Sequence, residues 1–256
     1  MTAPTDHIHN QESFEPERVT RRVGNVVYHP EVYQGSEEWA ALRCGLLTAS
    51  EMKLLFTPAL KPAVNDKTRA HVYEIAAQRI SRHVEPHYIG DDMLRGHQEE
   101  VEARILYEKQ YAPVTECGFV TNDKWGFTLG YSPDGLVGDD GLIEAKSRRQ
   151  RFQIETIAEY VWIGKSAKAP SEFVIQLQTG LLISERKWID FLSYSNGLPM
   201  VAIRVYPDDM LQDAILETAA EFEAQVLERM ENYGNALGSD ARLTPTERRV
   251  EQEMIL

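Results

Sequence analysis

The sequence predicts a mixed α/β fold in which helices flank a central mixed β-sheet. Helical patterns dominate up to about residue 111, a series of strand-like segments follows, and helices and strands then alternate. The length of 256 residues fits one large domain, and 43% hydrophobic with 26% charged residues is typical of a globular protein. No Gly-x-Gly-x-x-Gly pattern follows a predicted strand and no Walker A loop is present, so a Rossmann fold and a nucleotide cofactor are not supported.

Two short helices are predicted near the start of the domain. Ser36 suits the N-cap of the first helix, and Gly45 suits its end. Residues 48–51, Thr-Ala-Ser-Glu, match a capping box that opens the second helix. Ser50 then lies in the first turn of this second helix, where free backbone N–H groups bind anions. Arg43, from the last turn of the preceding helix, is placed to face it.

The later elements alternate in type. Apolar periodicity predicts helices over residues 67–82 and 91–111, with Leu94, Val101 and Ile105 as the apolar stripe of the second. Segments rich in β-branched and aromatic residues predict strands over 115–121, 125–132, 136–137, 142–147, 188–193 and 201–206. Further helical patterns cover 152–160, 171–183 and 208–233.

The domain is predicted to span residues 25–237. Residues 1–24 are polar without apolar periodicity, which predicts a disordered tail, and residues 238–256 are predicted to form a loose C-terminal tail. No apolar run approaches the length of a membrane span, and the first residues lack a signal-peptide core. Two cysteines disfavour a disulfide framework, a structural zinc site and a four-cysteine iron–sulfur cluster. A cytoplasmic protein is expected.

The charge distribution limits how nucleic acid could be bound. A net charge of −13 disfavours non-specific surface binding, because phosphate neutralisation supplies much of the affinity for DNA. Basic residues nevertheless cluster in Lys146-Ser-Arg-Arg-Gln-Arg151, whereas much of the acid lies in residues 217–231. A protein that holds DNA within a localised basic channel is compatible with this pattern.

The most informative chemical pattern is a predicted hairpin at residues 131–146. Gly138-Asp-Asp-Gly141 has the composition of a tight turn between two apolar runs. Glu144 and Lys146 are two residues apart and so share one face of a strand, with Asp134 just before the hairpin. Carboxylate oxygens suit a hard cation such as Mg²⁺, and an adjacent ammonium stabilises developing charge. These are the functional groups that metal-assisted hydrolysis of a phosphodiester requires.

The hairpin alone does not decide the function. An Asp at a loosely fixed distance before Glu-x-Lys arises by chance in roughly half of chains of this length, and a charged, solvated hairpin is the alternative. Gln176 and Gln178 lie in a largely apolar predicted helix, where amides need hydrogen-bond partners. The two amides either form hydrogen bonds with groups around each other or face a polar site.

Four separated segments have the composition of motifs found together in one family. They are residues 34–50 with Trp39, Leu-Arg-x-Gly and Thr-Ala-Ser; residues 96–104 with Gly-x-Gln-x-Glu; Ser132-Pro-Asp-Gly135 with Glu144-Ala-Lys146; and Gln176-Leu-Gln178. In this order they resemble the phage lambda-type alkaline exonucleases, the YqaJ-like viral recombinase group of the PD-(D/E)XK nucleases. The resemblance covers residues 34–183 and implies a restriction-endonuclease-like core.

The resemblance implies a site for Mg²⁺, for which Mn²⁺ would substitute. The implied ligands are Asp134, Glu144, the backbone carbonyl of Ala145 and, directly or through water, Glu100. Lys146 would orient or activate the attacking water, and Gln178 would assist in that site. Glu99 and Glu102 share the helix of Glu100, so the choice among the three glutamates rests on the Gly-x-Gln-x-Glu register.

The resemblance also implies a pocket for a terminal 5′-phosphate. The implied residues are Arg43, Ser50 and Ser132, in agreement with the predicted position of Arg43 beside a helix N-terminus. Trp39 is either a core aromatic, which is the commoner role, or a contact to DNA. Arg148 and Arg149, with Arg151 nearby, either contact the DNA backbone or form a solvated basic turn.

The function implied is a Mg²⁺-dependent 5′→3′ exonuclease acting on the ends of linear double-stranded DNA. It would release mononucleotides and leave 3′ single-stranded DNA for homologous recombination, in a bacterial or phage-infected cell. The resemblance also implies a ring-shaped assembly of three subunits and a single-strand annealing protein as partner. The alternatives are another PD-(D/E)XK nuclease (an endonuclease or a 3′-directed enzyme), a catalytically silent DNA-end-binding scaffold, and a metal-binding domain without a DNA partner.

Overall fold

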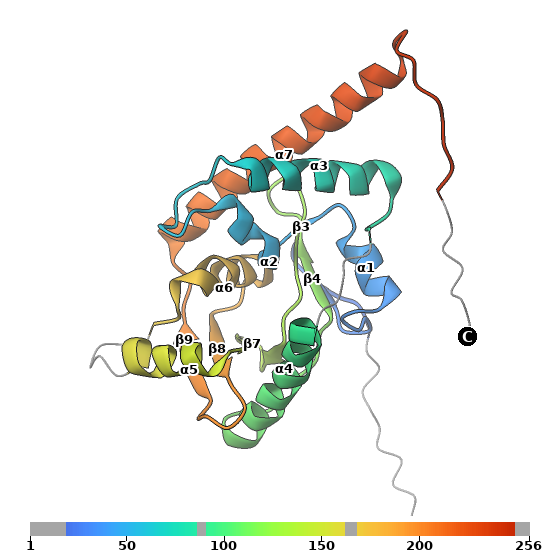
Figure 1. Ribbon diagram of the computed structural model, residues 1–256. Helices are drawn as coiled ribbons and strands as arrows, with labels where there is room; N and C mark the ends of the chain where they lie inside the picture. Colours follow the sequence, from blue (N-terminus) through green and yellow to red (C-terminus); the bar gives the residue numbers. More distant parts are fainter. Residues whose placement is uncertain (1–18, 86–90, 162–167, 249–256) are drawn as a thin grey trace, which may run out of the picture.

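The computed structural model describes residues 19–85, 91–161 and 168–248, and has the predicted mixed α/β architecture. Its strands form two sheets, and helices cover them on several sides (Figure 1). The sequence patterns predicted a single central sheet, whereas the strands before and after Asp134 belong to different sheets. The junction between the two sheets is where the candidate site forms.

The first sheet has five strands in the order β1-β2-β4-β5-β3. Its strands are β1 (Arg21–Val23), β2 (Val26–His29), β3 (Leu47–Thr48), β4 (Phe119–Asn122) and β5 (Leu129–Tyr131). All neighbours are antiparallel except β3, which runs parallel to β5. The β1–β2 hairpin corrects the prediction of a tail over residues 1–24, because Gly24, at φ 61°, allows a tight turn that pairs residues 21–23 with β2. Residues 1–18 lie outside the described residues.

The second sheet has four strands in the order β6-β7-β8-β9. Its strands are β6 (Gly135–Val137), β7 (Gly141–Ser147), β8 (Trp188–Tyr194) and β9 (Val201–Val205). The predicted β6–β7 hairpin is confirmed, with Gly135 opposite Ile143. Since β6 is only three residues long, no strand of the described chain pairs with the β6-side edge of β7 beyond Ile143. Side chains therefore have access to this edge.

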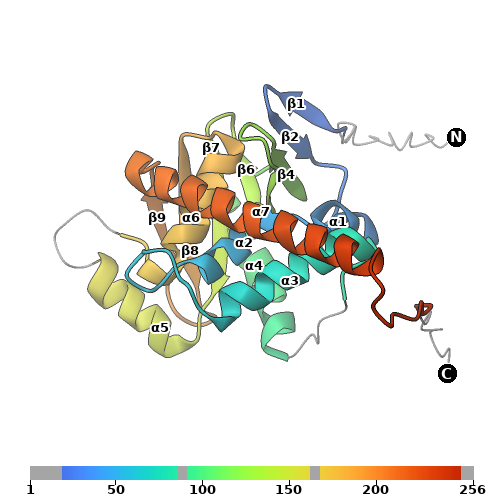
Figure 2. The ribbon, with the colours of Figure 1, turned by 90° about the horizontal axis from the view of Figure 1, so that it is seen from above.

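The helices begin and end close to the predicted residues. They are α1 (Glu37–Arg43), α2 (Ala49–Met52), η1 (Lys53–Leu55), α3 (Asp66–Ser81), α4 (Asp91–Gln110), α5 (Gln150–Glu155), η2 (Thr156–Val161), α6 (Ser171–Ser184) and α7 (Asp209–Leu237). Ser36 caps α1 by accepting from the backbone N–H of Trp39 at 3.2 Å, and the Thr48–Glu51 capping box is present. Helix α7 crosses α3 on the outside of the molecule (Figure 2).

Helix α6 is buried at the centre of the main hydrophobic core, against both sheets. Gly180 on this helix lies against the ring of Tyr131, and a Cβ there would approach Tyr131 Cζ to 2.8 Å. The missing side chain thus leaves room for a fully buried tyrosine from β5. This packing directs the Tyr131 hydroxyl towards β7.

The apolar stripe predicted for α4 faces outward, so that interpretation was wrong about the packed side. Leu94, Val101 and Ile105 are 59%, 46% and 57% exposed. The buried face instead has Ala103 and Tyr107, which pack with Ile143, Ala145 and Leu192 of the second sheet. Helical spacing places Glu100 on this inner face, three residues before Ala103. The helix therefore brings a carboxylate to the edge of β7 while leaving an apolar stripe at the surface.

Candidate active site

The edge of β7 that β6 leaves unpaired is hydrogen-bonded to a carboxylate from outside the second sheet. Asp134, in the connection between β5 and β6, accepts a hydrogen bond from the backbone N–H of Ala145 at 2.7 Å. In a strand, the N–H and C=O of one residue point to the same side. The Ala145 carbonyl is therefore expected to face the same edge as Asp134, as the predicted ligand set requires.

Glu144 is the buried centre of the site. Its Oε1 accepts a hydrogen bond from Lys146 Nζ at 2.7 Å and another from Gln176 Nε2, while its Oε2 accepts from the Tyr131 hydroxyl at 2.8 Å. Glu144 and Lys146 therefore share a face of β7, as predicted from their spacing. These three donors use three of the roughly four lone-pair sites of the carboxylate, which leaves a site on Oε2 for a cation.

The charges in this cluster are strongly coupled. Burial raises the pKa of Asp134 well above its usual range, and repulsion from Glu144 raises it further. Burial also raises the pKa of Glu100, against the attraction of Lys146. Burial opposes the charge on Lys146, but Glu144 and Asp134 outweigh it and raise the pKa of the ammonium. One ammonium thus faces three carboxylates, an excess of negative charge that favours a cation.

The donors that converge here are all oxygen atoms, which suits Mg²⁺. In the described part of the chain, no three His, Cys, Asp or Glu side chains already form a closed metal cage. Two of the predicted ligands instead accept hydrogen bonds from residues of β7. Asp134 accepts from the Ala145 backbone N–H, and Glu144 accepts from Lys146 Nζ. The residues fit a site built from two β7-edge carboxylates and a backbone carbonyl, with Glu100 beside it.

Among the three candidate glutamates on α4, the structure directs only Glu100 towards the cluster. Glu99 accepts a hydrogen bond from the Ser147 hydroxyl. Glu102 accepts from the Tyr194 hydroxyl at 2.9 Å. Glu100 interacts electrostatically with Lys146 and Glu144. The register chosen from the sequence therefore selects the glutamate that lies at the site.

The assignment of Gln178 to the site was wrong, and Gln176 takes that place. Gln178 donates to the Tyr206 carbonyl at 2.8 Å and accepts from the Asp208 backbone N–H at 2.9 Å, so it anchors the start of α7. Residues two apart on a helix point in nearly opposite directions, so only one of the two glutamines can reach Glu144. The sequence showed that the amides needed partners but not which one faced the site.

Substitution of the two glutamines should have different effects. Gln176→Ala is expected to lower kcat by about 10- to 100-fold, as for residues that orient a metal ligand, with little change in unfolding. Gln178→Ala should instead lower the free energy of unfolding by about 2 kcal/mol, because it leaves backbone groups near Asp208 without partners. Nuclease assays and chemical denaturation of both variants test this. Equal kcat losses would contradict the geometric distinction.

A second cluster, on α1 and the β5–β6 connection, contains the predicted phosphate-binding residues. Ser132 Oγ accepts hydrogen bonds from Trp39 Nε1 at 2.8 Å and from Arg43 Nη1 at 3.5 Å. With both lone pairs used, the Ser132 hydroxyl proton is available for donation to an anion. Arg43 also stacks on Trp39, with its Cζ 4.4 Å from the ring centroid. Trp39 therefore supports the arginine rather than filling the core.

The Arg43 cation is held near hydroxyl groups of α2. Its Nη2 donates to Thr48 Oγ1 at 3.3 Å, and Thr48 Oγ1 lies 3.2 Å from Ser50 Oγ. Burial lowers the pKa of Arg43, whereas the charge of Glu51 raises it. A desolvated guanidinium with neighbouring hydroxyl groups favours an anionic partner. The three predicted residues of this pocket, Arg43, Ser50 and Ser132, thus lie together, with Trp39 beside them.

The connection between α1 and β3, which joins Arg43 to Thr48, is held in place by residues that the sequence interpretation missed. Gly45, at φ 76°, accepts from Arg79 Nε at 2.7 Å through its carbonyl and donates to Gln78 Oε1 at 2.9 Å. Arg79 also pairs with Glu223 of α7 at 2.5 and 2.7 Å. The sequence placed Arg79 only within the predicted helix over residues 67–82, and nothing local signals a contact 144 residues away.

The basic run after β7 is only partly exposed. Arg148 is buried, pairs with Glu172 and stacks on Phe152 and Phe173 at 5.0 Å. Its prediction as a DNA contact is therefore wrong, because the guanidinium is used within the fold. Arg149 is exposed at the N-cap of α5. Arg151 is exposed and stacks on Phe152 at 4.3 Å.

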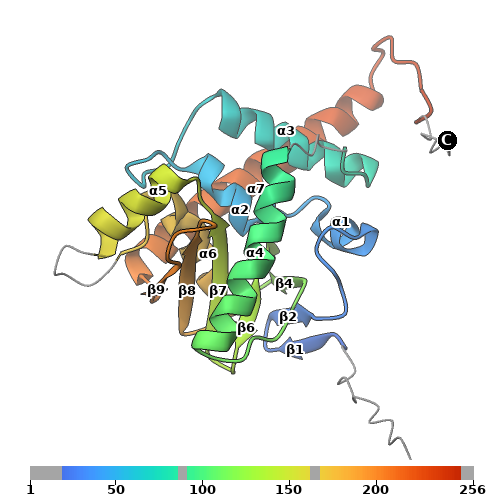
Figure 3. The same ribbon diagram turned by 60° about the horizontal axis from the view of Figure 1, so that its bottom comes forward.

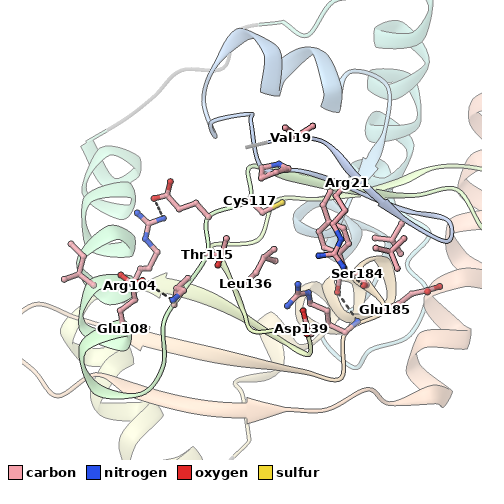
Figure 4. Close-up of a pocket in the computed structure, with 18 residues that line it drawn as sticks. Val19, Arg21, Arg104, Glu108, Thr115, Cys117, Leu136, Asp139, Ser184 and Glu185 are labelled. Carbon is pink, nitrogen blue, oxygen red and sulfur yellow. Dashed lines mark hydrogen bonds and ion pairs between the residues drawn. The ribbon is translucent and has the colours of Figure 1, made fainter. Parts of the chain in front are cut away.

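A groove begins at the carboxylates. A hollow of about 490 Å³ is lined by Glu100 and Asp134 together with residues 32–35 of the β2–α1 loop. A larger cavity of about 850 Å³ lies next to the β1–β2 hairpin (Figure 4). Both are lined by Arg104, which pairs with Glu116 at 2.6 Å. The larger cavity contains none of the predicted site residues.

The fold and the site together define the nuclease class: a carboxylate–lysine cluster at a strand edge, beside an arginine–serine pocket. Residues 38–187 match the YqaJ-like viral recombinase domain. The chain belongs to this family. No curated protein sequence matches significantly.

Solved structures agree with this family. An alkaline exonuclease from Laribacter hongkongensis, LHK-Exo, is 32% identical, with a TM-score of 0.68 over 79% of this chain and 98% of that one. The same protein in complex with dAMP matches with a TM-score of 0.64 at 32% identity, over 79% of this chain and 100% of that one. A phage-related exonuclease from Haemophilus somnus 129PT matches at 13% identity, TM-score 0.50, over 73% and 96% of the two chains, which shows the fold alone.

Within residues 19–85, 91–161 and 168–248, no helix is both long and apolar enough to cross a membrane.

Proposed function

We propose that this protein is a Mg²⁺-dependent 5′→3′ exonuclease that degrades one strand of linear double-stranded DNA to mononucleotides. The observation that carries the proposal is the proximity of the two clusters. Ser132 in the phosphate pocket and Asp134 at the edge of β7 are two residues apart, so their Cα atoms are separated by about 7 Å at most. This separation is comparable to the span of one nucleotide. A terminal phosphate held by Arg43 would place the next phosphodiester at the carboxylates.

Each residue has a defined role in this proposal. Mg²⁺, held by Asp134, Glu144 and the Ala145 carbonyl, would polarise the scissile phosphate and lower the pKa of the attacking water. Lys146, whose ammonium is kept charged by Glu144, stabilises negative charge as it develops on the phosphate. Tyr131 and Gln176 orient Glu144 by hydrogen bonds. LHK-Exo, with its dAMP complex, supports a nucleotide-releasing exonuclease.

The proposed activity is tested by the form of DNA that is cut. Purified protein with Mg²⁺ is expected to release mononucleotides from 5′-phosphorylated linear duplex and to leave covalently closed circular DNA intact, because the circle has no end for Arg43 to hold. Cutting of the circle would indicate an endonuclease. Duplex binding without cleavage in Mg²⁺ or Mn²⁺ would indicate a silent end-binding scaffold.

The raised carboxyl pKa values predict how pH affects stability and metal binding. Because the pKa values of Asp134 and Glu100 are raised by folding, the metal-free fold loses stability as pH rises above about 4, the ordinary carboxyl value. Mg²⁺ would offset this repulsion, so its stabilising effect should grow with pH. Thermal melting between pH 5 and 8, with and without Mg²⁺, is the measurement. An Asp134→Asn variant should melt higher than wild type without metal and gain less from Mg²⁺, whereas an equal Mg²⁺ effect at all pH values would contradict the assignment.

We further propose a homo-oligomer, with α4 in the interface. Leu94, Val101 and Ile105 form an exposed apolar stripe on this helix, next to the active-site groove. Exposed apolar stripes of this kind mark interaction sites in soluble proteins. A ring of three subunits would enclose DNA, and a single-strand annealing protein is the partner expected to receive the 3′ strand. We propose that the protein acts on DNA in the cytoplasm of a bacterial or phage-infected cell.

A further inference from the structure

A third cluster of polar groups lies beyond the carboxylates and takes no part in the proposed chemistry. It forms a cavity of about 320 Å³ at the C-terminal ends of β7 and β8. The residues that line it include Arg95, Glu99, Arg148, Arg149, Gln150 and Asn196. They come from α4, the β7–α5 connection, the first residue of α5 and the turn after β8.

The cavity is lined mainly by arginine in a chain of net charge −13. Three arginines and one glutamate line it, and Glu99 accepts a hydrogen bond from the Ser147 hydroxyl. Arg148 is buried and anchored by Glu172, whereas Arg95 and Arg149 are exposed. Amide side chains complete the lining and suit the phosphate and sugar oxygens of a nucleic-acid backbone.

The position of the cavity relates it to the substrate path. Lys146, Ser147 and Arg148 are consecutive along the end of β7, and Glu99 is next to Glu100 on α4. The cavity therefore begins directly beyond the reactive groups. Helices α1 and α5 lie on opposite sides of α4 (Figures 1 and 3). The phosphate pocket on α1 and the arginine cavity beside α5 thus flank the carboxylates from two sides.

We propose that this cavity binds the sugar–phosphate backbone of the cleaved strand on the interior side of the scissile phosphate. The inference rests on the proposed function, because it assumes that Arg43 holds the terminal phosphate. The strand then runs from the Arg43 pocket, past Glu144 and Lys146, to Arg95 and Arg149. The DNA backbone is then bound on both sides of the reacting bond. This keeps the strand at the carboxylates between turnovers.

The test uses 5′-phosphorylated duplexes in which a single phosphate is replaced by an uncharged methylphosphonate. Single-turnover release of the first nucleotide is measured in Mg²⁺ against protein concentration. With wild-type protein, a methylphosphonate one or two positions inside the scissile phosphate should raise the half-saturating concentration about tenfold, as for one lost charge-assisted hydrogen bond. The same replacement in the complementary strand should have no effect.

The variants assign that effect to the cavity. In Arg149→Ala and Arg95→Ala, unmodified duplex should bind about tenfold more weakly with a salt dependence smaller by about one phosphate contact, and the methylphosphonate should add no further loss. Arg151→Ala is the matched control, because Arg151 is exposed in the same basic run but does not line the cavity. It should behave as wild type.

Three outcomes separate the claims. A methylphosphonate effect that is equal in wild type and Arg149→Ala, or one confined to the complementary strand, would overturn the cavity assignment while leaving the exonuclease proposal intact. No nucleotide release by wild type from unmodified duplex would overturn the proposed function. Loss of the strand-specific effect in Arg149→Ala but not in Arg151→Ala supports the cavity.

Discussion

Glu144→Gln is expected to lower the rate of mononucleotide release by about 10³-fold or more. The substitution keeps the shape of the side chain but removes the charge that would hold Mg²⁺ and that keeps Lys146 in place at 2.7 Å. Metal-assisted polarisation contributes several kcal/mol to such reactions, which corresponds to this factor. Steady-state release from a 5′-phosphorylated duplex is the measurement.

Duplex binding and cleavage can be measured separately in the Glu144→Gln variant. Glu144→Gln should still bind 5′-phosphorylated duplex with an affinity close to wild type in the absence of divalent metal, since the Arg43 pocket is formed by other residues. Glu185→Gln provides a control, because this exposed carboxylate pairs with Lys124 away from the site. A Glu144→Gln protein with wild-type kcat would show that the cluster at β7 is structural.

Arg43→Ala is expected to remove the preference for a 5′-phosphate over a 5′-hydroxyl end, a loss of about 10²-fold or more in kcat/KM on phosphorylated duplex. The guanidinium is desolvated and already oriented by Ser132 and Trp39, so its charge-assisted hydrogen bonds to a phosphate would be strong. On 5′-hydroxyl duplex the variant should differ little from wild type. Paired assays on the two substrates measure the effect.

Arg43→Lys tests whether charge alone suffices. Lysine keeps the positive charge but lacks the planar fork that stacks on Trp39 and reaches both Ser132 and Thr48. It should recover only part of the phosphate preference. Full recovery would mean that the pocket acts as a point charge, and an unchanged preference in Arg43→Ala would remove the pocket from the account.

Local patterns predicted the parts of the site that depend on neighbouring residues. The capping box at residues 48–51 and the β6–β7 hairpin each involve contacts only a few residues apart, so their chemistry is visible in the sequence. The alternation of Glu144 and Lys146 on one face of β7 follows from strand geometry. The resemblance of four motifs then related segments that are distant along the chain.

The errors have a common physical cause, which is that periodicity defines a face but not its partner. Leu94, Val101 and Ile105 share a face of α4, yet that face points to solvent. Gln176 and Gln178 lie on opposite sides of α6, and only the packing of α6 against Tyr131 and β7 decides which one meets Glu144. The sequence could not show either contact.

Long-range pairing explains the remaining surprises. Arg148 lies in a basic run typical of a DNA contact, but Glu172 and two phenylalanines bind it within the fold. Arg79 donates to the Gly45 carbonyl and also pairs with Glu223, far along the chain. The shape of the phosphate pocket thus depends on the packing of α7 against α3, at a distance from the chemistry.

The central claim is that one strand is degraded from its phosphorylated 5′ end. The most direct measurement uses linear duplexes labelled separately at the 5′ and 3′ ends of one strand, with and without 5′-phosphate, incubated with Mg²⁺. The account predicts immediate release of the 5′ label as a mononucleotide, late release of the 3′ label, and much slower reaction without the phosphate. Early release of the 3′ label, or equal rates on both kinds of end, would contradict it.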